Sequence, residues 1–370
     1  MDQFDVVIVG AGPAGSTAAH YIASQGHSVA LLDAAAFPRK KPCAGWLNAK
    51  ATDLIKEMGV RQSDVITGKI DELIFCNKDL TQSASPKLDG PAALLVDRVE
   101  FDQRLVEACQ KAGVEFRDRH LVTGVQALEQ TVEVKIRDRE AVAGRLLLIA
   151  TGLSRSLLNP LGIQLPKESR SAWSAHVEAP RESSTKVRKA KAVVVLGATR
   201  DSGACIAIEQ ADRVSVTLNS GGDSKTLSHR LVELAGAMAK EGFISQDLSG
   251  NPDGVRCIPT IPSSALEMDS HVGKHTLVIG DAGGFYAAVS NEGIFPAMWS
   301  ARIAAEIAAE ALATPITQDV LMRFDTRWRL DMGEFLRPPN TDMQLLIPLV
   351  FTNQPMADRM AAAFFTGENI

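Results

Sequence analysis

A glycine-rich turn near the N-terminus has the residue types and spacing that bind a phosphate group. Gly10, Gly12 and Gly15 form a Gly-x-Gly-x-x-Gly pattern directly after a run of β-branched residues. In such a turn the first glycine permits the tight bend, the second lets the backbone approach a pyrophosphate, and the third lets helix and strand pack closely. Pro13 and Ala14 suit the first turn of a helix, whose N-terminal amides attract an anion. The pattern predicts a dinucleotide site.

A carboxylate lies where the ribose of a dinucleotide is expected. Asp33 ends the second predicted strand, residues 29–32, at about the usual 20 residues after the glycines. A carboxylate at this place accepts hydrogen bonds from ribose hydroxyls and disfavours the 2′-phosphate of NADP. Bound NADP is therefore not expected at this site.

A second glycine cluster far downstream points to FAD rather than NAD. Gly280 and Asp281 leave a predicted strand at 277–279 in a glycine-rich loop, and a long helix is expected from Gly293 and Ile294. NAD dehydrogenases lack this cluster. A helix that begins at Gly293 would direct its positive end at the pyrimidine edge of a flavin and stabilise a negatively charged ring. FAD is the expected cofactor.

Four residues in the same segments are candidates for contact with the reacting groups. Cys43 and Trp46 follow the second strand, Phe285 follows the second glycine cluster, and Asn291 precedes the helix. A thiol at Cys43 would lie over the flavin, and aromatic rings would hold a planar substrate. The alternatives are a small buried cysteine and ordinary packing of the rings around the cofactor.

The elements that must position these residues are those of a parallel sheet with covering helices. Apolar runs at 6–9, 29–32 and 146–150 are typical of parallel strands that are buried on both faces. The helix predicted at 13–25 joins the first two strands in a right-handed βαβ unit. A second amphipathic helix is predicted at 100–112.

The predicted fold is α/β: a Rossmann-type FAD-binding domain like that of glutathione reductase, an inserted antiparallel-sheet substrate domain and a helical C-terminal tail. Residues near 192–196, 205–208 and 214–218 are predicted to form short antiparallel strands, and a helix near 226–240 is expected to pack across them. The FAD-binding domain is expected at 1–75, 94–166 and 267–312. The substrate domain is expected at 76–93 and 167–266, and the helical region at 313–370.

Composition indicates an ordinary folded protein. The 370 residues carry a net charge of −5, and no basic block is longer than Arg39–Lys41, which argues against nucleic acid. Five cysteines without a close pair fit a reducing compartment, and no metal site is expected because lone histidines such as His20 and His176 lack ligand partners. Neither an export signal nor a transmembrane segment is predicted. The expected location is the cytoplasm.

Four segments together resemble the geranylgeranyl reductase and aromatic-hydroxylase superfamily of FAD enzymes, the group A flavin monooxygenases, which includes flavin-dependent halogenases. They are residues 10–15, 37–45, 96–102 and 280–294. The resemblance implies that Asp281 contacts the ribityl-pyrophosphate part of FAD, that Arg98 lies along the cofactor, and that Val122 meets the adenine. The remaining implied FAD contacts are Arg39, Cys43, Ala44, Thr151 and Gly152.

Three departures from the superfamily patterns bear on the reaction. The hydroxylases carry Asp-Gly where this chain has Thr151-Gly152, so the external electron donor, NAD(P)H or reduced flavin, is left open. Residues 203–209 lack the aromatic-rich pattern that prenyl reductases carry in the substrate sheet. The tryptophan-rich halogenase motif is absent, and Ala288 replaces the family proline, which argues against halogenation.

The preferred interpretation is a flavin monooxygenase that hydroxylates an aromatic substrate. The substrate is either a small molecule or a tryptophan side chain of a partner protein, as in the subgroup that modifies tryptophan during biogenesis of a tryptophylquinone cofactor. An alternative is reduction of carbon–carbon double bonds in the manner of geranylgeranyl reductase, which Cys43 and its neighbours favour. A third, from another class, is a flavin-bound scaffold without catalytic activity.

Overall fold

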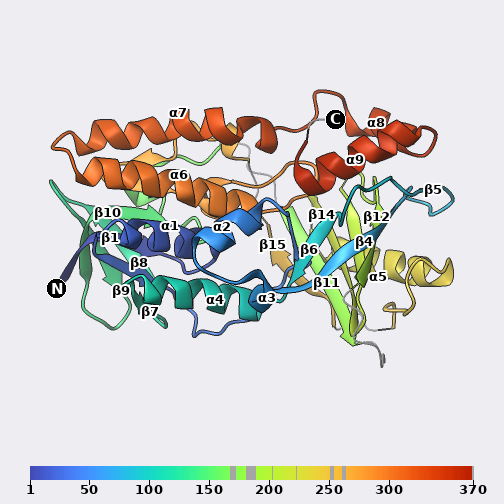
Figure 1. Ribbon diagram of the computed structural model, residues 1–370, viewed down its shortest axis with the longest axis horizontal. Helices are drawn as coiled ribbons and strands as arrows, with labels where there is room; N and C mark the ends of the chain where they lie inside the picture. Colours follow the sequence, from blue (N-terminus) through green and yellow to red (C-terminus); the bar gives the residue numbers. More distant parts are fainter. Residues whose placement is uncertain are drawn as a thin grey trace.

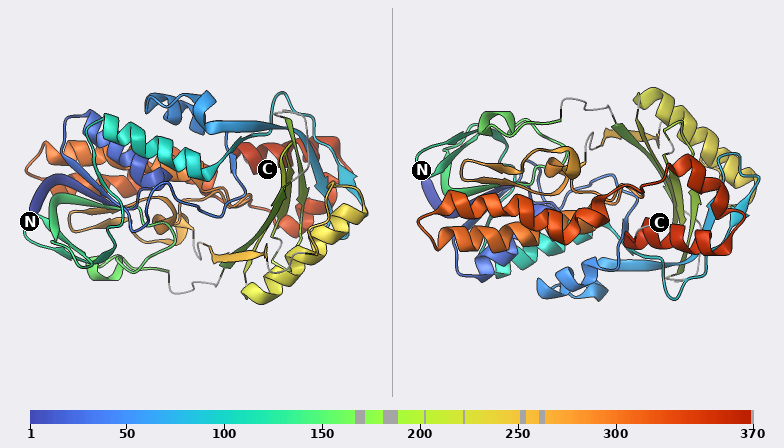
Figure 2. Two further views of the ribbon diagram at one scale, coloured as in Figure 1. Left: turned by 90° about the horizontal axis from the view of Figure 1, so that it is seen from below. Right: turned by 90° about the horizontal axis from the view of Figure 1, so that it is seen from above.

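The computed structural model describes residues 1–166, 172–180, 189–201, 203–221, 223–250, 254–260 and 264–368. These residues form two β-sheets at opposite ends of an elongated molecule, with helices along both (Figures 1 and 2). The predicted architecture is confirmed: a Rossmann-type FAD-binding fold, a second sheet and a helical C-terminal region.

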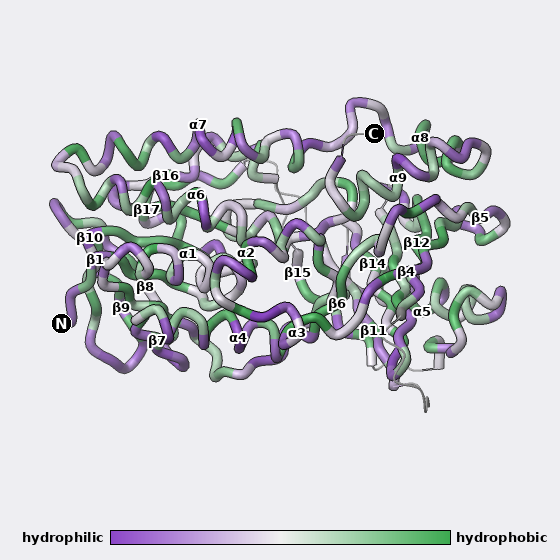
Figure 3. The backbone as a smooth tube through the Cα atoms, viewed as in Figure 1, coloured by the Kyte–Doolittle hydropathy of each residue, from purple (hydrophilic) through white to green (hydrophobic). Residues whose placement is uncertain are grey.

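The first sheet is largely parallel and has the order β16-β17-β10-β1-β2-β7. The strands in this order are β1 (Asp2–Val9), β2 (Val29–Leu32), β7 (Glu115–Arg117), β10 (Val142–Ile149), β16 (Val272–Gly273) and β17 (Thr276–Val278). The sheet also includes β8 (Val122–Ala127) and β9 (Val132–Ile136), a hairpin that joins it through the antiparallel pair of β9 with β10. β1 pairs in parallel with both β2 and β10, and its last four residues are buried. The continuous hydrophobic stretches of β1 and β10 (Figure 3) suit this central position, because helices and a hairpin cover the two faces.

Three helices cover one face of the first sheet. They are α1 (Pro13–Ser24), α4 (Arg98–Lys111) and α6 (Ile294–Leu312). The hairpin of β8 (Val122–Ala127) and β9 (Val132–Ile136), with the 3₁₀ turn η1 (Asn159–Leu161), packs on the opposite face. The helices predicted near 13–25 and 100–112 are thus present.

The second sheet has the order β15-β11-β14-β13-β12-β4-β6-β3, with β5 beside β4. Its strands are β3 (Trp46–Leu47), β4 (Ile66–Cys76), β5 (Ser83–Ala84), β6 (Ala93–Val96), β11 (Ala172–Pro180), β12 (Lys189–Val195), β13 (Cys205–Glu209), β14 (Arg213–Gly221) and β15 (Arg256–Pro259). All of its strand pairs are antiparallel except β12 with β4.

The second sheet takes more of the N-terminal chain than the expected boundaries give it. Residues 66–75 of β4 fall in the range 1–75 that was expected in the FAD-binding domain, yet they pair with β12 and β6. A short apolar run such as β4 has the same sequence pattern in either sheet. Its assignment to the second sheet therefore follows only from its strand partners. The expected boundary at 166/167 adjoins residues 167–171, which lie outside the described residues. Division of the chain into these domains stays a prediction.

Helices cover both faces of the second sheet. α5 (Ser224–Lys240) packs on one face, and α9 (Gln354–Thr366) with α8 (Met343–Val350) packs on the other (Figure 2). α7 (Thr317–Leu336) runs beside α6 over the first sheet (Figure 1). Short helices α2 (Ala51–Glu57) and α3 (Gln62–Val65) complete the connection between the sheets. No helix among the described residues is long and apolar enough to cross a membrane.

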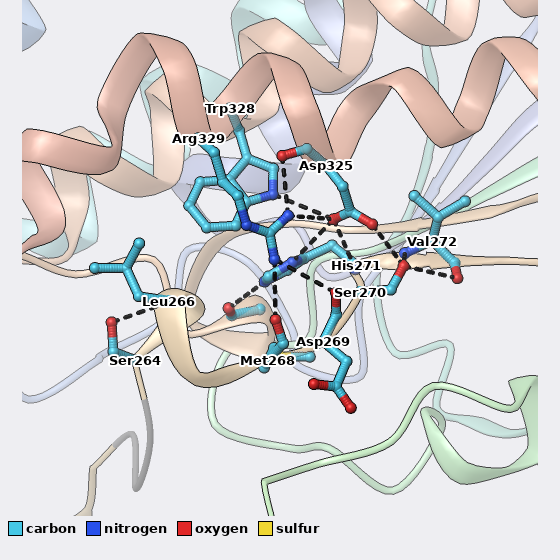
Figure 4. Close-up of polar contacts among 11 residues, drawn as sticks. Ser264, Leu266, Met268, Asp269, Ser270, His271, Val272, Asp325, Trp328 and Arg329 are labelled. Atoms are coloured by element: carbon cyan, nitrogen blue, oxygen red, sulfur yellow. Dashed lines mark hydrogen bonds and ion pairs between the residues drawn. The ribbon is translucent and has the colours of Figure 1, made fainter.

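A buried polar cluster fastens α7 to the segments that precede β16 and follow β17 (Figure 4). Asp325 on α7 accepts hydrogen bonds from the Ser270 hydroxyl at 2.6 Å and from the His271 amide at 3.0 Å. The His271 ring is fully buried, and its Nε2 donates to the carbonyl oxygen of Gly283 at 2.7 Å. Gly283 belongs to the 3₁₀ turn η4 (Gly280–Gly283), so this cluster fixes η4 in place.

Replacement of Asp325 tests the strength of this attachment. Burial alone would raise the pKa of Asp325, but the interactions with His271 and Ser270 hold it well below its ordinary value. A lowered pKa gives stability that is present above the unfolded value near 3.9 and is lost as the pH falls below it. Asp325→Asn should therefore reduce the free energy of unfolding by roughly 2–3 kcal/mol at pH 7, and by less near pH 3.

Urea unfolding at the two pH values measures this difference. Asp331→Asn is the matched control, because Asp331 lies on the same helix and forms only an exposed pair with Arg327. Equal free energies of unfolding of the two variants at pH 7 would contradict the inference that the Asp325 cluster stabilises the position of α7.

Candidate functional site

A cavity of about 580 Å³ begins at the carboxyl ends of the parallel strands and reaches the second sheet. At its first end lie Gly10 after β1, Asp33 after β2 and Thr151 after β10. At its other end lie residues of β11, β13, β14 and β15. Carboxyl ends of parallel strands are where ligands of open α/β sheets bind.

Most of the site residues predicted from the sequence line this one cavity, although they come from eight separate segments. Those in the lining are Gly10, Gly12, Pro13, Ala14, Asp33, Arg39, Cys43, Ala44, Trp46, Arg98, Val122, Thr151, Gly152, Asp281, Asn291, Gly293 and Ile294. Gly15, Gly280 and Phe285 are not among the lining residues.

The three glycines of the first turn are needed for different structural reasons. Gly10 has φ +105°, and a Cβ there would lie 2.2 Å from the Ala150 carbonyl oxygen. A Cβ on Gly15 would lie 1.7 Å from the Gly10 carbonyl oxygen, so Gly15 serves the close packing of α1 on β1 rather than contact with a ligand. At Gly12, by contrast, the nearest described atom to an added Cβ is Arg39 Nη2, at 3.4 Å. Gly12 therefore faces open space.

Gly280 also acts through packing. Its φ is +61°, and a Cβ there would lie 2.8 Å from the Ala14 side chain. Gly15 and Gly280 thus act through packing: each lets a neighbouring segment come close beside the cavity.

Asp33 holds the glycine turn in shape. Its Oδ2 accepts a hydrogen bond from the Ala11 amide at 2.8 Å, and its Oδ1 accepts one from the Ala35 amide at 2.8 Å. Each carboxylate oxygen has a second lone pair that remains able to accept a hydroxyl. The side chain both shapes the turn and presents acceptors to the cavity.

A buried ion network places cations beside the glycine turn. Arg98 makes two hydrogen bonds of 2.9 Å to the carboxylate of Asp102, which is fully buried. Arg39 Nη2 lies 3.2 Å from Asp102 Oδ2, and Lys41 Nζ lies 3.5 Å from Asp281 Oδ2. Burial alone would lower the pKa of Arg98, but Asp102 raises it above its ordinary value. These cations suit a pyrophosphate.

Phe285 was predicted to contact the substrate, and the structure corrects this. The ring is fully buried beside His271 and Trp328, at centroid distances of 4.8 and 5.1 Å. The left-handed Gly284 turns the chain after η4, so that Phe285 joins the aromatic core under α7. Tyr286, the next residue, lines the cavity instead.

The N-terminus of α6 is capped by a side chain of its own segment. Glu292 Oε1 accepts a hydrogen bond from the Phe295 amide at 2.8 Å, so this amide already has a partner within the protein. Glu292 is 5% exposed, and its Oε2 has no hydrogen-bond partner among the described residues. Burial raises the pKa of Glu292 to about 8, and Asp281 acts in the same direction. Glu292 is therefore largely neutral at pH 7.

Several residues of the cavity wall were missed by sequence reasoning, among them three polar ones at the second sheet. Ser174 on β11 and Thr217 and Asn219 on β14 line the end of the cavity at the second sheet. Ser174 is paired in register with Asn219. Polar residues at alternating positions of an otherwise apolar strand were the available signal, because side chains two apart share a face.

Comparison with known proteins decides the family. The model of the family described as FAD binding domain matches residues 3–233, which is more than half of the chain. The chain belongs to the FAD binding domain family. It is an FAD-dependent oxidoreductase, and it is a member of the superfamily of geranylgeranyl reductases and group A flavin monooxygenases.

Two curated relatives align with most of this flavoprotein. Conditioned medium factor receptor 1 of Dictyostelium discoideum is 24% identical over 353 residues, which are 89% of this chain and 68% of that protein. Digeranylgeranylglycerophospholipid reductase 1 of Methanococcoides burtonii is 24% identical over 349 residues, which are 90% of this chain and 81% of that protein.

Two solved structures have the same fold. A geranylgeranyl bacteriochlorophyll reductase-like protein from Thermoplasma acidophilum has a TM-score of 0.76 at 17% identity, over 100% of this chain and 98% of that one. The flavin-dependent brominase Bmp2 has a TM-score of 0.74 at 17% identity, over 98% and 94% of the two chains. At these identities the likeness concerns the fold alone.

The cavity of the flavoprotein fits the parts of FAD in order. We expect the pyrophosphate at Gly12 and Arg39, the adenosine ribose at Asp33, and the adenine toward Val122. The ring system is then expected near Trp46 and the start of α6. The open backbone at Gly12 carries this assignment, because a phosphate needs the space that a side chain would take.

Gly12→Val tests this placement. The backbone at Gly12 has φ −76°, which any residue adopts, so the variant should fold. We expect FAD affinity to fall by at least about 100-fold, or ~3 kcal/mol, since the valine side chain occupies the phosphate position. Quenching of FAD fluorescence measures affinity, and circular dichroism measures folding.

Gly90→Val is the matched control, because no described atom lies within 4 Å of the position that a Cβ would take there. It should bind FAD as the parent protein does. A folded Gly12→Val variant that keeps its yellow cofactor would refute the assignment.

Glu292→Gln tests whether the Glu292 carboxyl group is protonated in the folded protein. In the FAD-free parent protein, the raised pKa of Glu292 contributes to the free energy of unfolding. This contribution is fully present below the unfolded pKa of about 4.3 and is lost as the pH rises through about 8. The glutamine variant cannot ionise. We expect it to match the parent near pH 4.5 and to exceed it by roughly 2–4 kcal/mol near pH 9 in urea unfolding.

Glu310→Gln on the same helix is the control, since Glu310 is exposed beside Arg323. Its stability should follow the parent at each pH. If Glu292→Gln also follows the parent throughout, Glu292 ionises normally and the inference is wrong.

Proposed function

We propose that this FAD-dependent oxidoreductase hydroxylates an aromatic substrate, either a small molecule or a tryptophan side chain of a partner protein. The observation that supports this most is the polar wall where the cavity meets the second sheet. Ser174, Thr217 and Asn219 form that wall, next to the position expected for the flavin ring.

The chemistry of the wall favours a substrate with hydrogen-bonding edges. Hydroxyl and amide groups that a ligand buries without partners cost roughly 1–3 kcal/mol each. A fully hydrocarbon chain would leave the side-chain polar groups of Ser174 and Asn219 without partners, whereas a ring that carries N–H or O–H groups would satisfy them. Ile206 and Ile258 in the same lining suit the apolar faces of such a ring.

Trp46 supplies a rigid aromatic surface. It is 6% exposed, and its ring contacts Phe364 and Phe365 of α9 at centroid distances of 6.1 and 5.1 Å. The C-terminal helix therefore fixes the orientation of Trp46 in the cavity. Aromatic rings in offset or edge contact add about 0.5–1.5 kcal/mol beyond burial, and an aromatic substrate would gain from this surface.

When bound, reduced FAD supplies the electrons that activate oxygen for transfer to the substrate. The residues of the chain bind the cofactor, orient the substrate and keep water from the reacting atoms. The electron donor, NAD(P)H or reduced flavin, is not fixed by the residues of the cavity, and either is compatible with the proposal.

A second candidate is reduction of a carbon–carbon double bond. The observation that favours it is the place of Cys43, which lines the cavity and whose Sγ accepts a hydrogen bond from the Gly45 amide at 3.4 Å. The buried Arg98 also interacts with Cys43. In such a reaction the flavin would deliver hydride to one carbon and a thiol would give a proton to the other. A flavin-bound scaffold is the third alternative.

A single-turnover experiment separates these functions. The FAD-loaded protein is reduced without oxygen, mixed with tryptophan, a tryptophan-containing peptide or geranylgeranyl diphosphate, and then exposed to ¹⁸O₂. We expect one ¹⁸O atom in an aromatic product, by mass spectrometry, and none when oxygen is withheld.

Protein that is never reduced is the control for oxygen chemistry in solution. A prenyl product with two added hydrogens and no ¹⁸O would support double-bond reduction instead. Flavin that cannot be reduced by any donor would support the scaffold.

A further inference from the structure

A buried histidine on the neighbouring strand contacts Thr217 of the polar wall on the same face of the sheet. His176 on β11 lies directly opposite Thr217 on β14 in the antiparallel pair. The distance from His176 Nδ1 to Thr217 Oγ1 is 2.8 Å, and both residues are buried, at 8% and 5% exposure. Thr217 lines the cavity, so its hydroxyl connects the cavity with the imidazole.

The second ring nitrogen of His176 faces a carboxylate at the protein surface. His176 Nε2 lies 3.8 Å from Glu178 Oε2, and a rotation of the exposed Glu178 side chain brings the two atoms within hydrogen-bond distance. The Glu178 side chain is 56% exposed, whereas that of His176 is 10% exposed. Residues 176 and 178 share a face of β11 because side chains alternate along a strand. Thr217, His176 and Glu178 thus form a continuous polar line from cavity to solvent.

The electrostatic setting keeps the imidazole able to pass a proton. Burial lowers the pKa of His176, Glu178 opposes this shift, and Arg256 on the neighbouring β15 adds to it. A neutral imidazole has one N–H donor and one acceptor nitrogen, so it can accept a proton at one nitrogen and release one at the other.

We propose that Thr217, His176 and Glu178 carry a proton between the substrate cavity and solvent. This inference rests on the proposed function, because an aromatic substrate that is attacked through oxygen transfer becomes more reactive when its O–H or N–H proton leaves. Nothing is oxidised or reduced in this step.

The proton transfers balance along the line. The Thr217 hydroxyl accepts the substrate proton and gives its own to Nδ1 of His176. The Nε2 proton of His176 then passes to the Glu178 carboxylate and from there to solvent. The substrate keeps the electron pair of the broken bond as an anion. His176 acts through Thr217 and is therefore a positioning and relay residue rather than a catalytic residue.

A phenol that changes colour on ionisation tests the relay without oxygen or flavin reduction. We would bind 4-nitrophenol to the FAD-loaded protein and follow its ionisation by stopped-flow absorbance after a pH jump across neutrality. His176→Gln and Thr217→Val should slow ionisation of the bound phenol by at least about 10-fold. Thr217→Ser, which keeps the hydroxyl, should retain the rate of the parent protein.

The affinity of FAD, measured by fluorescence, should not change in these variants, which separates the relay from a folding defect. An unchanged ionisation rate in a folded His176→Gln variant would overturn the proposal. Failure of oxygen incorporation with an intact ionisation effect would instead count against the hydroxylase function alone.

Nitrogen NMR of labelled histidine tests the same line without any probe molecule. In the FAD-loaded protein His176 should be neutral at pH 7, with Nδ1 in a hydrogen bond that Thr217→Val removes. Glu178→Gln should lower the pKa of His176 further, because it removes the charge that opposes burial. A His176 signal that is cationic at pH 7, or that neither substitution shifts, would refute the relay.

Discussion

The close approach of α1 to the β1–β10 pair is the constraint on which the rest of the site depends. Gly10 and Gly15 leave no room for side chains there, with backbone oxygens 2.2 and 1.7 Å from the positions that Cβ atoms would take. This contact sets the helix N-terminus beside the carboxyl ends of the parallel strands. Gly12 then faces open space between them, and Arg39 lies across it. A dinucleotide phosphate fits where the packing has left backbone exposed.

In the proposed function, the second sheet supplies the substrate end of the cavity. The cavity continues from the glycine turn to a wall built from β11, β13, β14 and β15. α9 packs against Trp46, and the hydrogen bonds of Asp325 and His271 fix the position of η4. Segments distant in sequence thus fix the two ends of one cavity. Chemistry at the cavity depends on both layers, since the first positions a cofactor and the second presents polar groups to a substrate.

The sequence predicted features that depend on local rules and missed those that depend on distant partners. Spacing and periodicity predicted the glycine turns, Asp33 and the long helices. The resemblance to known FAD enzymes indicated many of the residues that line the cavity. Phe285 was placed wrongly because its direction is decided by α7, some forty residues later. His176 was interpreted as a lone structural residue, since Thr217 becomes its neighbour only through strand pairing. Glu292 likewise gave no signal until its burial was known.

We expect FAD to lie along the cavity with its pyrophosphate at Gly12 and its ring system at the boundary with the second sheet. A crystal structure of the FAD complex tests this most directly. Phosphate oxygens should lie against the Gly12 backbone and Arg39, a ribose at Asp33, and the ring between Trp46 and the start of α6. A cofactor bound with its pyrophosphate away from the Gly12 turn, or with its ring remote from the second sheet, would contradict it.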